Sequence, residues 1–179
     1  KGFADLIHAL SILRECDWAV TLLIAGSVNS ASVAYREHLK TLTRKLNLTN
    51  QVIFDETLTH NQMPWLLSSS DVVVQPSLEE GLGLAVIEAM ACERSVVTTC
   101  IPGITEIVTD TNTAVLVQPQ SPHQLADVIG SLLSDSDYRY RLGTRARQHV
   151  LEHFSLERMS FETAKLIETI QNKVSQNAN

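Results

Sequence analysis

Two glutamates flank a glycine turn in the segment PSLEEGLGLAVIEAMA, residues 76–91. Glu80 precedes Gly81 and Gly83, and Glu88 lies about one turn inside the helix that we expect to begin near Gly83. Glycine tolerates positive φ and lets the backbone approach a ligand closely. The free N–H groups at the start of a helix favour an anion, most commonly phosphate. Carboxylates accept hydrogen bonds, so they repel phosphate and suit hydroxyl donors.

These features fit a ligand with phosphate in the middle and hydroxyl-rich groups at both ends, which is the shape of a nucleotide sugar. A structural interpretation stays open, because any tight strand-to-helix turn can use two glycines and glutamate is a good helix former. We expect Glu79 to face solvent. A metal site at Glu79, Glu80 and Glu88 is disfavoured, because no Asp or His joins these carboxylates in register.

The composition predicts one globular domain. The chain has 179 residues, 44% of them hydrophobic, which is enough for a packed core. Its 14 basic and 20 acidic residues give a net charge of -6, which argues against a nucleic-acid or anionic-lipid binder. No apolar run approaches the roughly 18 residues needed to span a bilayer, and no secretory leader is visible. Because the chain begins with Lys-Gly and no Met, we expect a piece of a longer protein.

The cysteines and histidines predict no metal or disulfide framework. Cys16, Cys92 and Cys100 stand at unrelated spacings, so we interpret them as reduced, mostly buried thiols that suit a cytosolic protein. The six histidines form no HxxxH pair, so a zinc site is not expected.

Short apolar runs alternate with helical periodicity along the chain. The runs predict buried strands at 19–26, 51–54, 71–76, 95–99 and 114–119. Helical spacing predicts helices at 3–13, 31–46, 62–67, 83–92, 121–133, 137–152 and 155–173. This alternation is typical of an α/β, Rossmann-like, doubly wound parallel sheet with helices on both faces. Ligands of such sheets bind beyond the carboxyl ends of the strands, where the glycine–glutamate segment lies.

Local signals add two capping boxes. Thr59 with Gln62, and Ser121 with Gln124, have the spacing at which a cap and a reciprocal side chain satisfy free backbone donors. Pro122 fits the first position of its helix.

Three aromatic side chains have no clear chemical partner in the sequence. We expect Trp18, Phe54 and Trp65 to pack in the core or at its rim, in preference to stacking on a base.

The segment PSLEEGLGLAVIEAMA resembles the E-x7-E segment of retaining GT-B glycosyltransferases, best known from glycosyltransferase family 4. Its usual form is close to P-S-x-x-E-G-F-G-L-x-x-x-E-A-M-A, and Glu80 and Glu88 fall on the two glutamates. KGFADLIHAL, LLIAG, QVIF, SSSDVVVQPS and AVLVQP also match the C-terminal domain of that family in order. The resemblance covers nearly the whole chain.

The resemblance implies the C-terminal half of a GT-B fold. Residues 1–172 would form the nucleotide-sugar (donor) binding domain, lacking its first strand, and residues 173–179 a polar tail. The N-terminal domain that binds the acceptor is absent from this chain. The implied activity is that of a retaining, hexosyltransferase-like enzyme. We expect no transfer by the chain alone, because half a cleft cannot align donor and acceptor.

The resemblance also assigns roles to residues. Glu88 would hold the ribose hydroxyls and Glu80 the hydroxyls of the transferred sugar, while Lys1 would pair with the diphosphate. Backbone N–H groups would contact sugar and diphosphate at Gly81, Leu82, Gly83 and Leu84. Bond breaking leaves negative charge on the nucleoside diphosphate, and Lys1 and the helix start would stabilise that charge where it develops. Family members use no divalent metal, so we expect no cofactor beyond the donor substrate. An arginine that relatives carry upstream of the lysine is absent here.

The expected partners are a nucleotide sugar and, through the missing domain, a sugar, lipid-linked or other acceptor. We expect no nucleic-acid partner. The expected location is the cytoplasm, with peripheral membrane association of the full-length protein. Two alternatives stay open: a non-catalytic GT-B-like nucleotide-binding or interaction module, and a nucleotide-sugar epimerase. The spacing of Glu80 and Glu88 disfavours the epimerase.

Departures from the family pattern motivate the non-catalytic alternative. Glu56, Glu93 and Pro102 stand where glycines are usual. Glu93 occupies a helix C-cap, where a left-handed backbone is expensive for a residue with a side chain. Pro102 precedes Gly103 in a loop near the expected donor sugar.

Overall fold

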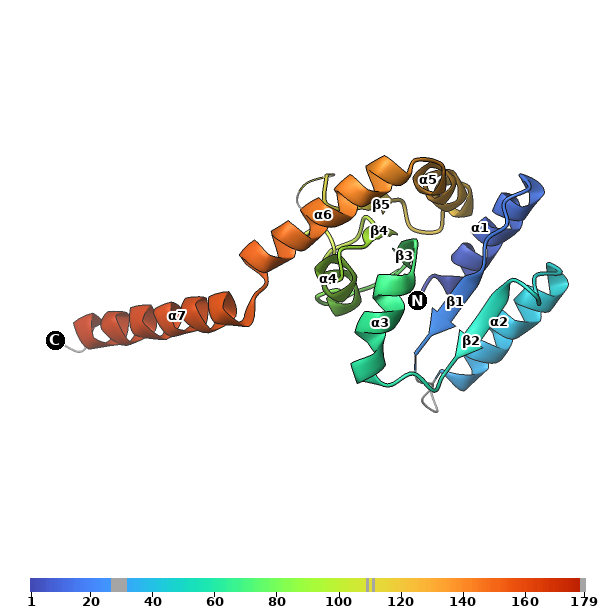
Figure 1. Ribbon diagram of the computed structural model, residues 1–179. Coiled ribbons are helices and arrows are strands. Elements are labelled where there is room, and N and C mark those ends of the chain that lie inside the picture. Colours follow the sequence, from blue (N-terminus) through green and yellow to red (C-terminus); the bar gives the residue numbers. More distant parts are fainter. Residues whose placement is uncertain (27–31, 109, 111, 178–179) are drawn as a thin grey trace.

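The computed structural model describes residues 1–26, 32–108, 110 and 112–177, with the backbone alone for 174–177. Figure 1 shows the elements in chain order. They are α1 (Phe3–Glu15), β1 (Leu22–Ala25), α2 (Val33–Lys45), β2 (Val52–Asp55), the 3-10 turn η1 (His60–Gln62), α3 (Met63–Ser69), β3 (Val72–Gln75), α4 (Leu84–Ala91), β4 (Ser95–Thr99), β5 (Val115–Val117), α5 (Pro122–Ser134), α6 (Ser136–His153) and α7 (Leu156–Asn177).

The predicted α/β fold is confirmed, and every strand pairing in the described residues is parallel. The strands do not form one continuous sheet, however. β1 pairs with β2, while β3, β4 and β5 form a separate sheet in that order. The break therefore falls between β1 and β3.

Helices cover both faces of the three-stranded sheet, as predicted. Val96 and Val97, neighbours on β4, point to opposite faces because side chains alternate along a strand. Val96 packs in a cluster with residues of α4 and α6, and Val97 packs in a cluster with residues of α1 and α5. Both valines are fully buried. The core therefore lies on either side of β4.

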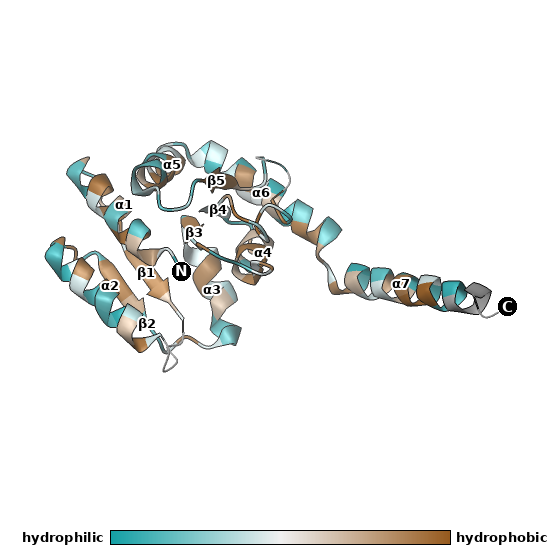
Figure 2. Cartoon of the chain, turned by 180° about the vertical axis from the view of Figure 1, so that it is seen from behind, coloured by the Kyte–Doolittle hydropathy of each residue, from teal (hydrophilic) through white to brown (hydrophobic). Residues whose placement is uncertain are grey.

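Helix α7 projects away from the body of the molecule (Figure 1). Every side chain from Leu156 to Lys173 is exposed, and apolar bands are visible along the helix in Figure 2. The helix continues to Asn177, so it includes most of the segment predicted as a polar tail, 173–179. Residues 178 and 179 lie outside the described residues. Among the described residues, no helix is both long and apolar enough to cross a membrane.

One of the two predicted capping boxes forms. The side-chain oxygen of Gln62 accepts a hydrogen bond from the backbone N–H of Thr59 at 2.9 Å. The other prediction was wrong, because the Gln124 oxygen accepts from the backbone N–H of Gln118 at 2.8 Å, just beyond β5. Pro122 does begin α5, as predicted.

Two packing predictions need correction. Trp65 is 81% exposed and does not pack in the core, whereas Trp18 and Phe54 are partly buried against core clusters, as predicted. The thiols are free, but Cys16 and Cys100 are exposed and only Cys92 is partly buried. The expectation of mostly buried thiols was therefore wrong.

Candidate functional site

The candidate site lies in the loop between β3 and α4, at the carboxyl edge of the sheet. A chain of hydrogen bonds fixes its first carboxylate. Gln75 donates from its amide nitrogen to the Ser77 hydroxyl at 2.9 Å, and Ser77 donates to Glu80 Oε2 at 3.1 Å. The Thr99 hydroxyl, at the end of β4, donates to the Ser77 carbonyl. Because Ser77 and Thr99 are buried, these contacts anchor the Glu80 carboxylate to the sheet.

Lys1 lies beside the same carboxylate. Its Nζ is 3.8 Å from Glu80 Oε2. The Tyr35 hydroxyl of α2 donates to the Lys1 carbonyl at 3.2 Å, and burial raises the pKa of Tyr35, which keeps this donor protonated. The Lys1 side chain is 60% exposed, so the ion pair adds little stability. Its importance is positional: the two residues predicted to be catalytic are side by side.

Glycines fit two close approaches in this region. Gly83 caps α4 with φ 67°, and a Cβ there would lie 2.6 Å from Ile104 Cδ1. Gly103 has φ 82°, and a Cβ there would lie 2.4 Å from the Glu80 carbonyl oxygen. Gly81 differs, because it has no positive φ and open space surrounds the position of a Cβ. Its use is therefore access to the backbone.

The start of α4 presents free backbone donors. The first helical hydrogen bond there runs from Val86 N–H to the Gly83 carbonyl, no described side chain caps the helix, and its first turn holds no acidic residue. Leu82 and Leu84 are 51% and 61% exposed. An anion can approach this end.

Glu88 lies further along α4 and is partly buried. It lines a cavity between β1 and β3, together with Ala85 from the same helix. Neither Glu80 nor any of residues 81–84 borders that cavity. The two glutamates are therefore positioned by different surroundings, one by a hydrogen-bonded loop and the other by a helix. Glu79 is exposed, as predicted.

Sequence reasoning missed the residues that support Glu80. Ser77 was within the quoted motif, but its role depends on Thr99 and Gly103, which are distant in sequence. The Gly-after-Pro pair at 102–103 was the one available signal, since Gly103 has a left-handed backbone.

The departures at 56 and 93 have simple structural explanations. Glu56 pairs with Arg36, whose guanidinium lies 5.5 Å from the centre of the Phe54 ring. Glu93 adopts the left-handed conformation that a glycine would take, with φ 59°. Its carboxylate accepts a hydrogen bond from the Thr144 hydroxyl at 2.8 Å. The backbone shape at position 93 is thus kept without glycine.

Titratable side chains elsewhere do not add a metal centre. Within the described ranges, no three or more His, Cys, Asp or Glu side chains gather in a way that could hold a metal ion. In the loop after β2, the hydroxyl and backbone N–H of Thr57 hold the pKa of Asp55 below its usual value. These bonds to Thr57 fix the shape of that loop.

The parallel strands, their two helical layers and the glycine–glutamate loop at the carboxyl edge define the C-terminal domain of a GT-B glycosyltransferase. Residues 1–149 match the model of the family described as glycosyl transferases group 1. The chain belongs to this family.

Individual relatives agree with this assignment. A D-inositol 3-phosphate glycosyltransferase of Salinispora tropica is 32% identical over 157 residues, covering 86% of this chain and 32% of the relative. The C-terminal domain of the group 1 protein LpcC from Francisella tularensis superposes with a TM-score of 0.77 at 29% identity, covering 87% of this chain and 80% of that one. TarM of S. aureus, solved with UDP, fondaparinux and alpha-GlcNAc-glycerol, gives a TM-score of 0.80 at 25% identity, covering 90% and 32%. The chain spans 32–37% of the length of three similar curated relatives.

Proposed function

We propose that this chain is the donor-binding domain of a retaining glycosyltransferase of family 4 and binds a nucleotide-diphosphate sugar at the loop between β3 and α4. The observation that carries the proposal is the placement of the Lys1 ammonium beside the anchored Glu80 carboxylate, in the loop that leads into the uncapped start of α4. This combination offers one group for hydroxyls and two for a diphosphate. TarM, a relative solved with UDP, supports a nucleoside diphosphate as the leaving group.

Each group has a separate task in the proposed complex. Glu80 accepts hydrogen bonds from hydroxyls of the transferred sugar, and Glu88 accepts them from the ribose. Lys1 contacts the diphosphate, together with backbone N–H groups of residues 81–84. As the bond to the sugar breaks, negative charge grows on the diphosphate, and these fixed donors stabilise it. We propose that no metal or further cofactor is required, and that an acceptor-binding domain completes the cleft.

The non-catalytic alternative loses part of its motivation in the structure. Glu93 keeps the left-handed backbone, and Gly103 keeps the close approach to the Glu80 loop despite Pro102 beside it. The anchored carboxylate is therefore in place for binding a sugar. The epimerase alternative has no separate observation in its favour.

Calorimetric titration of the chain with UDP-glucose, GDP-mannose and ADP-glucose tests the proposal. We expect at least one donor to bind, and Glu88→Ala to weaken it by about 10- to 100-fold, because a hydrogen bond to a charged group contributes roughly 1.5–3 kcal/mol. Glu79→Ala is the matched control and should bind like the parent, since Glu79 is exposed. A folded chain that binds none of the three donors would contradict the proposal.

A further inference from the structure

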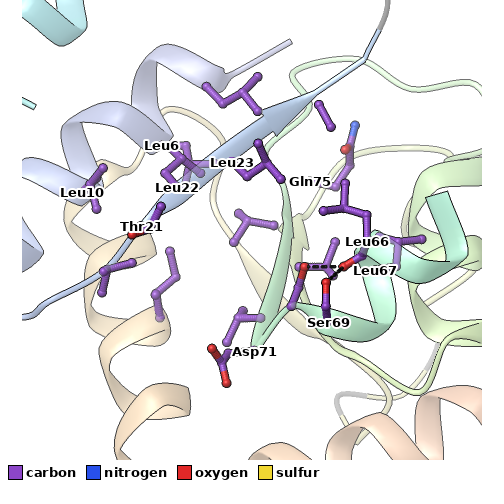
Figure 3. A pocket seen from close by; sticks show the side chains of 18 of the residues that line it. Leu6, Leu10, Thr21, Leu22, Leu23, Leu66, Leu67, Ser69, Asp71 and Gln75 are labelled. Atoms are coloured by element: carbon purple, nitrogen blue, oxygen red, sulfur yellow. Dashed lines mark hydrogen bonds between the residues drawn. The ribbon is translucent and has the colours of Figure 1, made fainter. Parts of the chain in front are cut away.

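A cavity of about 760 Å³ separates β1 from β3, and both strands line it along their whole length. Each strand is paired on its other side only, β1 with β2 and β3 with β4. The edges that face the cavity therefore have no strand partner in the described residues. Figure 3 shows side chains of α1, β1, α3 and β3 gathered around this space. We call it the inter-strand slot.

The lining of the slot is that of a protein core. Leu22 and Ile24 of β1, and Val72 and Val74 of β3, are only half-buried, although each points toward a layer of helices. All residues of β4, which has a strand on each side, are buried. Leu6 and Leu10 of α1 close one side of the slot, while Leu66 and Leu67 of α3 close the other. Two apolar, unpaired edges facing each other expose surface and backbone groups that globular proteins normally cover.

The chemistry of the slot selects an extended peptide over a small molecule. Backbone N–H and C=O groups along each edge recur at the spacing of a strand. Polar side chains border the slot mainly near strand ends, for example Asp71 and Gln75. An apolar strand would satisfy both backbone edges and bury the half-exposed valines and leucines, as in binding by strand addition.

The start of the chain shows where such a strand can come from. Gly2 packs against the end of β3, where an added Cβ would lie 1.8 Å from the Pro76 carbonyl oxygen. Figure 1 places the N-terminus between α1 and α3, close to β3 and β1. From there α1 leads back to the beginning of β1. A segment that reached Lys1 through the slot would run toward the carboxyl edge, parallel to both strands.

We propose that the inter-strand slot is the seat of one more parallel strand, formed by the polypeptide segment that directly precedes Lys1 in the longer protein. Four residues would match β1 and β3, which have four each. This strand would join the two sheets into one and fix Lys1 beside Glu80. The proposal rests on the two unpaired edges and does not depend on which donor binds.

An N-terminal extension of the chain tests the proposal. The probe is Lys-Thr-Ile-Val-Val-Ile-Gly-Ser placed directly before Lys1. The control replaces Ile and the second Val by Pro, which cannot donate to a ladder. We expect amide hydrogen exchange at β1 and β3 to slow by about tenfold or more with the apolar extension, because paired edges exchange through larger openings. The proline extension should leave both strands as they are in the parent chain.

Three outcomes would overturn the proposal. The two extensions could protect β1 and β3 equally. Protection could occur only in a dimer seen by light scattering, which would make a second copy the occupant. UDP-glucose could protect both edges of the parent chain, which would make the slot a ligand pocket. Should the extended chain fail to fold, the same two peptides are added to the folded parent chain, where only the apolar one should slow exchange at both strands.

Discussion

At the scale of single residues, the site depends on contacts that hold one carboxylate still. Glu80 is anchored by the Ser77 hydroxyl, which is fixed in turn by Gln75 and Thr99. A carboxylate held in one orientation recognises hydroxyls better than a mobile one, because less side-chain entropy is lost on binding. The relay therefore belongs to sugar recognition.

Removing the Ser77 hydroxyl should weaken binding of the sugar and spare the nucleotide. We expect Ser77→Ala to lower the affinity for UDP-glucose by about 5- to 10-fold, corresponding to roughly 1 kcal/mol for a hydrogen bond, with little change for UDP. Calorimetry with both ligands measures the ratio. Ser134→Ala, which removes a hydroxyl bonded within α5, is the control. Equal losses for UDP and UDP-glucose would contradict a role specific to the sugar.

Gly103 should be irreplaceable for a structural reason. Gly103→Ala places a Cβ 2.4 Å from the Glu80 carbonyl oxygen in a left-handed backbone, so we expect a loss of about 1–3 kcal/mol in the free energy of unfolding. Gly81→Ala, with open space around the new Cβ, should change stability by less than about 0.5 kcal/mol. Urea denaturation compares the two variants. Equal stabilities would show that the loop adapts.

Single residues also mark the limit of prediction from sequence. The glycine–glutamate pattern predicted the loop because its parts are neighbours in the chain. Thr99 and Gly103 reach this loop only because β4 lies beside β3, and no local pattern reports that contact. Trp65 was placed wrongly because aromatic character alone does not say which side of a short helix faces the core.

At the scale of elements, periodicity and strand composition predicted each helix and strand to within a few residues. The gap between β1 and β3 could not be predicted from periodicity, because the pairing partner of a strand is a tertiary property. Glu93 illustrates the opposite case. The helix end was predicted to need a left-handed residue, and the structure keeps that geometry with a glutamate.

Restoring glycine at this helix end should stabilise the protein. A left-handed backbone costs a residue with a side chain about 1–2 kcal/mol, while glycine costs about 0.5–1 kcal/mol in chain entropy. We therefore expect Glu93→Gly to raise the free energy of unfolding by about 0.5–1 kcal/mol in chemical denaturation. Glu93→Ala also removes the bond to Thr144 but keeps a Cβ, and it should not stabilise. A less stable glycine variant would show that the Thr144 contact outweighs the strain.

At the scale of the whole molecule, α7 stands apart from the folded body. Its described side chains are exposed throughout, so it adds little to the core, and a helix without tertiary contacts is marginal in water. Removing residues 156–179 should change the free energy of unfolding by less than about 0.5 kcal/mol. Val150→Ala, in the buried face of α6, should cost about 1–3 kcal/mol and shows that the assay is sensitive. A loss of similar size on removing α7 would contradict its independence.

The most direct test of donor binding by this chain is a two-dimensional amide NMR titration with UDP-glucose, which detects weak binding as well as strong. The account predicts saturable shifts centred on Glu80, Gly81, Gly83 and Leu84, at the loop and the start of α4. Titration with glucose alone is the control and should leave these amides unchanged. A folded chain whose loop amides do not move at millimolar UDP-glucose, or whose shifts lie only in other regions, would contradict the account.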